Sequence, residues 1–342
     1  MPCKNAANAR PFTWSAKPNG QETLTNMTMK KSRLLAAVVQ VFCVILAVSP
    51  CAGGEALRVF VTVPPQAYLA TRLGGTAVAV HTLINAGQDP HTYEPTPRQA
   101  TDLGRAHLFF TVDMPFEKHL VGKIVAGNRG LKVIDSTAGI PRLSTEEDHH
   151  DEDSGHRKGR NSAHKHDHHD GQPDPHVWLV PANLHRMAET MALAMMAQRP
   201  DLRQVLRRNL ATLQDELAAL DRRITAALAP YQGRTFYVFH PAFGYFADAY
   251  NLRQKAVETG GKSPTPRQLA ALIRQVEADG VKIIFVQPQF DAKSGGALAK
   301  AINGTVAPLD PLAHDVIGNL NTMTEALVRA FADAGAMKPG SH

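Results

Sequence analysis

Short runs rich in β-branched and aromatic residues alternate with longer amphipathic stretches from Leu57 onward. The amphipathic stretches, such as PQAYLATRLGG (65–75) and TPRQLAALIRQVEADG (265–280), have the spacing of helices, and the second offers Thr265 as a cap before Pro266. Strands that alternate with helices predict an α/β class with mostly parallel sheets. The predicted strands are LRVFVTV (57–63), VAVHTLI (78–84), AHLFFTV (106–112), LKVID (131–135), TFYVFH (235–240), QKAVE (254–258), VKIIFVQ (281–287) and TVAPLD (305–310).

One stretch, residues 201–229, has apolar residues at steps of three and four over its whole length, which predicts a helix with a single apolar stripe. At 1.5 Å per residue this helix would be about 43 Å long, enough to run the height of two lobes. We therefore expect two lobes, at 57–200 and 233–338, each with a mostly parallel sheet flanked by helices, joined by this one long rigid helix. The alternative is an ordinary helix hairpin with a break near Pro200.

A low-complexity insertion interrupts the first lobe at residues 144–172. It contains seven His, eight Asp/Glu and almost no apolar residue. Such a segment cannot bury enough apolar surface to offset its ordering entropy, so we expect a disordered loop. Its histidines would be mostly neutral at pH 7 and able to bind metal weakly. The alternative is a solvated insertion without a role.

Residues 1–56 form an N-terminal extension with the layout of a secretory signal peptide. MTMKKSR is its charged start, LLAAVVQVFCVILAV (34–48) its apolar region and SPCAGGEA a stretch of small residues where cleavage can occur. The apolar region is too short for a typical membrane span of about 20 residues. We therefore expect a periplasmic protein. A lipid anchor at Cys51 is an alternative, although Pro50 fits a lipoprotein signal poorly, and an uncleaved anchor is another.

The charge of the chain lies mostly in that extension. Net charge is +6, but the first 56 residues carry six Lys/Arg and two Asp/Glu, and the remainder, with 31 and 29, is close to neutral. No basic face for nucleic acid is therefore predicted. Cys3 and Cys43 precede any cleavage point, so the mature chain would contain no disulfide.

Three histidines and one aspartate are placed where a ligand would bind. His91 follows a predicted strand by a few residues, while His240 and Asp310 each end one. In open α/β sheets ligands bind beyond the carboxyl ends of the strands. His176 lies in DPHVWL, which repeats the tripeptide DPH of residues 89–91. A proline next to each of these four residues restricts the backbone that orients the side chain. Imidazoles together with a carboxylate suit zinc.

Each of these signals is weak by itself. A lone histidine at a strand end is more often a hydrogen-bonded structural group, and an Asp-Pro pair often caps a turn. The other histidines of the predicted folded part (His81, His107, His119, His185 and His314) have no comparable context. A zinc hydrolase would require an open coordination position, with Glu94 or Asp89 as candidate base. We find neither an HExxH nor a GxSxG motif and expect no enzyme.

Taken together, the motifs DPHTYEPTP, DPHVWL, FHPAFGYFA and LDPLA, in this order and spacing, resemble those of the solute-binding proteins of zinc and manganese ABC transporters. DMPFEKHL, the long helix, GKSPTPRQLAALI and IIFVQPQF extend the resemblance over residues 57–335. It implies two α/β lobes tied by one rigid helix, with a metal between them. It also implies that His91, His176, His240 and Asp310 are the four ligands. Four protein ligands would leave no open position for hydrolysis.

The resemblance also suggests which metal is bound. Manganese members have a carboxylate in the place of His240, whereas three imidazoles and one carboxylate favour Zn²⁺, as does the His-rich insertion; Mn²⁺ is the alternative. Some zinc members take their carboxylate from the loop around the first histidine, where Asp89 and Glu94 lie here, so Asp310 has two rivals. The implied function is a monomeric zinc receptor that delivers the ion to a membrane permease. A periplasmic zinc buffer or adhesin-like protein without a transporter is a further alternative.

Overall fold

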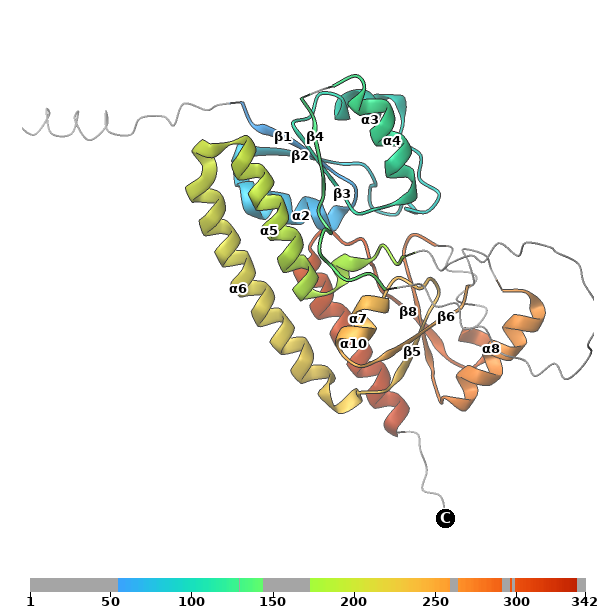
Figure 1. Cartoon of the computed structure of the whole chain (residues 1–342). Helices are drawn as coiled ribbons and strands as arrows, with labels where there is room; N and C mark the ends of the chain where they lie inside the picture. The colour runs from blue at the N-terminus through green and yellow to red at the C-terminus, as the bar shows by residue number, and fades with distance from the viewer. Residues whose placement is uncertain are drawn as a thin grey trace, which may run out of the picture. The chain divides into compact units, whose positions relative to one another are not determined.

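The computed structural model of the protein describes residues 55–128, 130–143, 173–258, 264–290, 296 and 299–336. Residues Glu55–His342 form one compact unit, which contains two sheets (Figure 1). The predicted signal peptide, Cys51 and the His-rich insertion at 144–172 lie outside the described residues. The lobe boundaries drawn from the sequence stay a prediction.

The first sheet has four parallel strands in the order β2-β1-β3-β4. Its strands are β1 (Leu57–Val61), β2 (Val78–Thr82), β3 (Leu108–Thr111) and β4 (Lys132–Asp135). They are connected by α2 (Pro64–Gly74), the short 3₁₀ turn η1 (Gly75–Ala77), α3 (Pro97–Leu103) and α4 (Pro115–Val125). All three helices begin with proline at their first turn, where the missing N–H is not needed.

The second sheet repeats this arrangement, with four parallel strands in the order β6-β5-β7-β8. They are β5 (Thr235–Val238), β6 (Arg253–Ala256), β7 (Ile283–Val286) and β8 (Thr305–Pro308). Its helices include α7 (Gly244–Ala249), α8 (Pro266–Ala278) and α10 (Val316–Ala336). The predicted cap of α8 is confirmed, because Thr265 Oγ1 accepts a hydrogen bond from the Gln268 amide.

Two long helices connect the two sheets. After the 3₁₀ turn η2 (Val177–Leu179), α5 (Pro181–Gln198) runs to a break at η3 (Pro200–Leu202). The chain then reverses into α6 (Arg203–Leu228), which leads through η4 (Ala229–Tyr231) to β5. Figure 1 shows α5 and α6 lying side by side, and α6 also packs against α2 and α10. The helix α6 is thus the predicted connection between the two sheets. Together with α5 it also forms the helix hairpin that was the alternative prediction.

Burial follows the predicted patterns closely. The four residues of β3 are all buried, as expected for an inner parallel strand covered on both faces. One continuous apolar cluster includes residues of both sheets and the buried stripe of α6, while a second, smaller one lies in the second lobe around Tyr237, Val276 and Ile284. The buried residues of α6 are Leu206, Leu213, Leu217, Leu220, Ile224 and Leu228.

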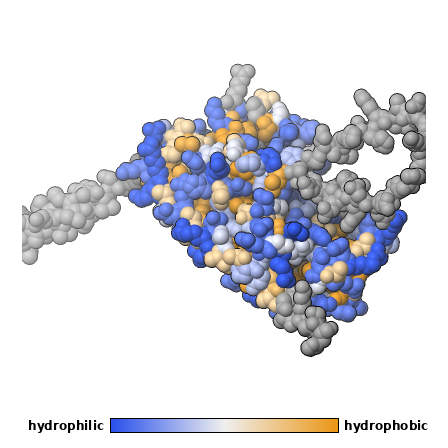
Figure 2. Space-filling view, turned by 60° about the horizontal axis from the view of Figure 1, so that its bottom comes forward, coloured by the Kyte–Doolittle hydropathy of each residue, from blue (hydrophilic) through white to orange (hydrophobic). Residues whose placement is uncertain are grey.

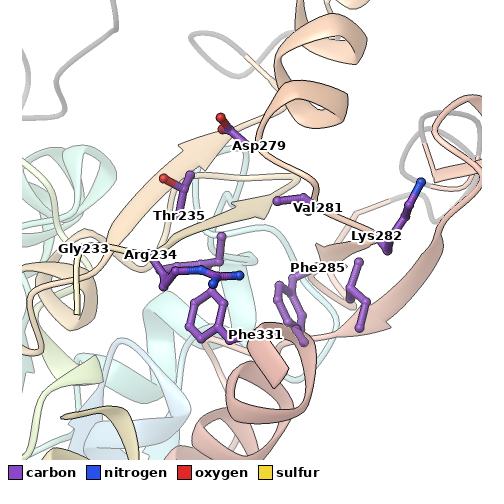
Figure 3. A pocket seen from close by; sticks show the side chains of 11 residues that line it. Gly233, Arg234, Thr235, Asp279, Val281, Lys282, Phe285 and Phe331 are labelled. Atoms are coloured by element: carbon purple, nitrogen blue, oxygen red, sulfur yellow. The ribbon is translucent and has the colours of Figure 1, made fainter. Parts of the chain in front are cut away.

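The visible surface is mostly polar with scattered apolar residues (Figure 2). Among the described residues, no helix is long and apolar enough for a bilayer. A cavity of about 190 Å³ lies at the amino ends of β5 and β7 against α10 (Figure 3). Arg234, Lys282 and Phe331 line it, and it contains none of the predicted metal ligands. Three of those predicted ligands, His91, His240 and Asp310, follow the opposite, carboxyl ends of strands, and His176 precedes η2.

Candidate metal centre

His240 is fixed at the carboxyl end of the second sheet, two residues beyond β5. Its backbone N–H donates to Gln287 Oε1 (3.0 Å), and its carbonyl accepts from Gln287 Nε2 (2.8 Å). Gln287, the residue after β7, is fully buried and thus clamps the His240 backbone to the neighbouring strand. The His240 side chain, in turn, bonds through Nδ1 to Glu258 Oε1, two residues beyond β6. Its Nε2 is therefore turned toward the other histidines.

His176 is held by buried neighbours on both sides. Its backbone N–H and its Nδ1 both bond to Asp174 Oδ1, at 2.9 and 2.7 Å. Val177 and Trp178, which follow in η2, are fully buried, and Trp178 Nε1 donates to the Pro311 carbonyl (2.7 Å). These contacts hold the His176 segment in the core of the protein. They also connect the His176 segment to the chain just after Asp310.

His91 lies on the exposed loop between β2 and α3. Its backbone N–H donates to Asp89 Oδ1 (2.9 Å), and Asp89 Oδ2 accepts from the Thr92 hydroxyl (3.0 Å). Asp89 therefore caps the turn that carries His91, with both of its oxygens engaged. The imidazole itself lies against the rings of His176 and His240, with centroids 5.6 and 4.8 Å away.

The three imidazoles converge although the outermost two lie 149 positions apart in the chain. One ring nitrogen of each lies within 4.8 Å of the others, and His91 Nε2 is 3.1 Å from His240 Nε2. For Zn–N bonds of about 2.05 Å, a tetrahedral ion needs nitrogens about 3.3 Å apart, so small side-chain shifts would accommodate it. Pro90, Gln289, Phe290, Pro311 and Leu312 complete the lining of this cavity. The set suits zinc in both donor type and spacing.

Burial and the neighbouring imidazoles favour the uncharged form of His91. The pKa of His91 is lowered from 6.5 to about 4, first by desolvation of its ring and then by repulsion from His176 and His240. Although the residue as a whole is exposed, its ring is turned toward the two other rings, which explains the desolvation. Near pH 7 His91 is therefore uncharged, the form that binds a metal.

Asp310, the predicted carboxylate ligand, lies at the margin of this cavity. Its Oδ1 accepts from Gln289 Nε2 (2.7 Å) and from the Leu312 amide (2.9 Å). Gln289 and Leu312 line the cavity, but the cluster of ligand atoms within 4.8 Å consists, among the described residues, of the three histidines. Asp310 as a ligand therefore stays a prediction, as do its rivals Asp89 and Glu94.

Three further polar groups near the histidines were not predicted from the sequence: Asp174 and Glu258, which bond to His176 and His240, and Gln289, which bonds to Asp310. A signal for two of them was present. Asp174 is the first residue of the repeated DPH tripeptide, and Glu258 ends a predicted strand at the same sheet edge as His240. The histidines judged structural have other contacts: His107 Nδ1 accepts from the Arg58 amide (3.0 Å), and His81 stacks on Phe60.

Comparison with known proteins gives a consistent result. The model of the ZnuA family, "zinc-uptake complex component A periplasmic", matches residues 59–334. The high-affinity zinc uptake system protein ZnuA of Yersinia pestis is 26% identical over 272 residues, covering 76% of this chain and 84% of that protein.

Solved structures match as well. A crystal structure of ZnuA is 34% identical, with a TM-score of 0.71 over 81% of this chain and 99% of that one. A ZnuA deletion mutant with zinc bound is also 34% identical, with a TM-score of 0.69 over 81% of this chain and 98% of that one.

Proposed function

The chain belongs to the ZnuA family of periplasmic zinc-uptake components, and from this premise we propose that it is a periplasmic receptor that binds one Zn²⁺ and delivers it to an ABC transporter permease. The members of the family are metal-binding transport receptors and not enzymes. We propose three properties of this chain: that its metal is zinc, that it works in the periplasm, and that it delivers the ion to a permease.

The observation that carries the proposal is the convergence of His91, His176 and His240 on one small cavity. Three imidazoles are a borderline-soft donor set, which favours zinc over manganese; manganese prefers sites richer in oxygen. The residue that would carry a carboxylate in a manganese receptor is His240 here, and its Nδ1 is bonded to Glu258. A histidine held in this way offers only its Nε2 to the ion.

We propose Asp310 as the fourth ligand. Its side-chain hydrogen bonds with the described residues both use Oδ1, so a small movement of the loop after β8 would bring Oδ2 toward the ion. Asp89 is a weaker candidate, because both of its oxygens already hold the turn at His91. With four protein ligands the ion would be enclosed, as in a site that binds and releases metal without chemistry.

The experiment is metal analysis of protein purified without added metal, followed by competition between Zn²⁺ and Mn²⁺. We expect one zinc per chain that a large excess of Mn²⁺ does not displace. His240→Ala should lower zinc affinity by at least about 100-fold, because it removes a buried ligand. His119→Ala, an exposed histidine of α4, is the matched control and should bind as the wild type does. Retention of manganese against zinc would contradict the choice of metal.

Delivery requires a permease surface that both lobes can reach. Because the ligands come from loops at the carboxyl ends of both sheets, we expect the permease to dock on the faces of both lobes that flank the cavity. Zinc uptake by cells that lack the protein, restored by the wild type and not by His240→Ala, would test transport as distinct from binding. Restoration by a variant that has lost zinc binding would rule out the receptor function.

A further inference from the structure

Two buried carboxylates stand directly behind two of the three histidines. We infer that Asp174 and Glu258 are positioning residues that fix His176 and His240 in the metal-binding form, and that His91, whose ring has no carboxylate partner among the described residues, is the ligand that closes the site last. This inference rests on the proposed zinc-binding function. It adds an order of events to the site and assigns roles to residues outside the ligand set.

The two carboxylates select the tautomer of the imidazole to which each is bonded. A carboxylate only accepts hydrogen bonds, so the Nδ1 atoms of His176 and His240 must carry the proton that bonds to Asp174 and Glu258. In the uncharged form of each ring the lone pair then lies on Nε2, which faces the cavity. Fixing the tautomer and the ring plane in advance removes a cost that would otherwise fall on metal binding.

The negative charge of the two buried carboxylates also favours a bound cation. The side chains of Asp174 and Glu258 are 3% and 6% exposed, so both carboxylates are largely removed from water. Within the described part of the chain their ion-pair partners are the two histidines, and neither pairs with a lysine or arginine. Buried carboxylates without a cation are costly. A divalent ion on the far side of the two imidazoles would supply two positive charges, which would balance the two negative charges of the carboxylates.

His91 differs from the two other histidines. Asp89 corresponds to Asp174 in the repeated DPH tripeptide, but it bonds to the His91 backbone and to Thr92 rather than to the imidazole. His176 and His240 are 4% and 8% exposed, whereas His91 is exposed on a loop. Its ring contacts His240 Nε2 through its own Nε2 (3.1 Å) and, among the described residues, has no carboxylate bonded to it.

An order of events follows from this contrast. An incoming ion first meets the two fixed Nε2 atoms of His176 and His240, and the His91 ring then turns to close the site. Release runs in reverse, because losing the His91 bond opens the exposed side of the cavity while the two buried ligands still hold the ion. Permease contact with the His91 loop would then be the step that promotes release.

The first test uses nitrogen-correlated NMR of histidine rings in the metal-free protein. We expect His176 and His240 each to show a single tautomer with the proton on Nδ1, and His91 to carry its proton on Nε2, which donates to His240 Nε2. Glu258→Ala should convert His240 alone to a mixture, and Asp174→Ala should do so for His176 alone. Glu258→Gln keeps an acceptor without the charge and provides a second variant if the alanine protein does not fold. Wild-type rings of His176 and His240 with the proton on Nε2 would overturn the inference.

The second test measures zinc binding in stopped flow against a fluorescent chelator. Glu258→Ala and Glu258→Gln should weaken zinc affinity about 10- to 100-fold, whereas Glu189→Gln, an exposed glutamate of α5, should not. His91→Ala should raise the dissociation rate and leave the association rate within about twofold, since His91 joins last. His240→Ala should slow association.

The outcomes separate the inference from the function on which it rests. If the wild type binds zinc one to one but the carboxylate variants bind equally well, the positioning roles are wrong and the receptor function stands. If His91→Ala slows association as much as His240→Ala does, the order of events is wrong. If the wild type binds no zinc, the proposed function fails, whatever tautomers the rings show.

Discussion

At the scale of single residues, the group bonded to one ring nitrogen of a histidine decides whether the other nitrogen can bind a metal. His240 and His107 both lie next to a strand. His107 Nδ1, however, accepts a hydrogen bond from the Arg58 amide. His240 Nδ1 is bonded to Glu258 Oε1, so its Nε2 faces the cavity. The neighbouring acceptor or donor therefore decides which histidine is available to an ion.

Glu117 is a further buried carboxylate, and it predicts a pH dependence of stability. It is 3% exposed, accepts from the amides of Val112 (3.0 Å) and Met114 (2.8 Å) and from the Thr62 hydroxyl, and burial raises its pKa from 4.5 to about 7. The folded state therefore binds this proton more tightly than the unfolded chain. The contribution of Glu117 to stability is greatest below about pH 4.5 and falls as pH rises toward 7, by on the order of 3 kcal/mol.

Urea unfolding at pH 5 and pH 7.5 would measure this effect. Glu117→Gln should remove that loss, so that the wild type loses more stability between the two pH values than the variant does. Glu189→Gln, an exposed glutamate, should keep the wild-type pH dependence. Parallel pH profiles for wild type and Glu117→Gln would show that this carboxyl titrates as it does in the unfolded chain.

At the scale of elements, α6 carries much of the packing that connects the two sheets. Its buried stripe faces α2, α5 and α10, while its other side is polar. Leu217 is 1% exposed in this stripe. Leu217→Ala should lower the free energy of unfolding by about 2–5 kcal/mol, the usual cost of a leucine-sized cavity.

The matched control is Leu193→Ala on α5, because that leucine is 58% exposed. It should change the free energy of unfolding by less than about 0.5 kcal/mol. Urea midpoints at constant slope give both values. A small effect at Leu217 would mean that α6 is not the rigid connection described above.

At the scale of the whole folded unit, we predict only small motion on zinc release. The packing of α6 against helices next to both sheets opposes a wide hinge, and the exposed His91 loop is the part best able to move. Small-angle scattering should therefore give the same radius of gyration with and without zinc, within error. A clear expansion on zinc removal would contradict this prediction.

The His-rich insertion at 144–172, outside the described residues, leads to another prediction. Asp174 N–H donates to the Leu143 carbonyl (2.8 Å), so the described residues that flank the insertion lie side by side. A deletion of 144–172 closed by a short linker should therefore leave Asp174 and His176 in place. Calorimetry should show one tight zinc site in the deletion variant and loss of weak sites only. Loss of the tight site would assign the insertion to it.

Much of the fold could be predicted from the sequence, because strands and helices follow from local patterns. All eight predicted strands form, each within one or two residues of its expected start, and the helix predicted at 201–229 forms at Arg203–Leu228. The hairpin of α5 and α6 was the less favoured reading, because the reversal at Arg199 and Pro200 depends on how both helices pack. The three histidines were found through position and motif, and the structure places them together.

The sequence by itself thus determined the elements, their order and the residue types able to bind zinc, since those depend on neighbours within a few positions. The tertiary structure decided which imidazole nitrogen faces the cavity and which carboxylate stands behind it. Glu258 meets His240 only because β6 and β5 pair in parallel, and His91 meets His240 only because the two sheets end at a common cavity. Contacts of that kind depend on chain packing over long separations, which local patterns do not record.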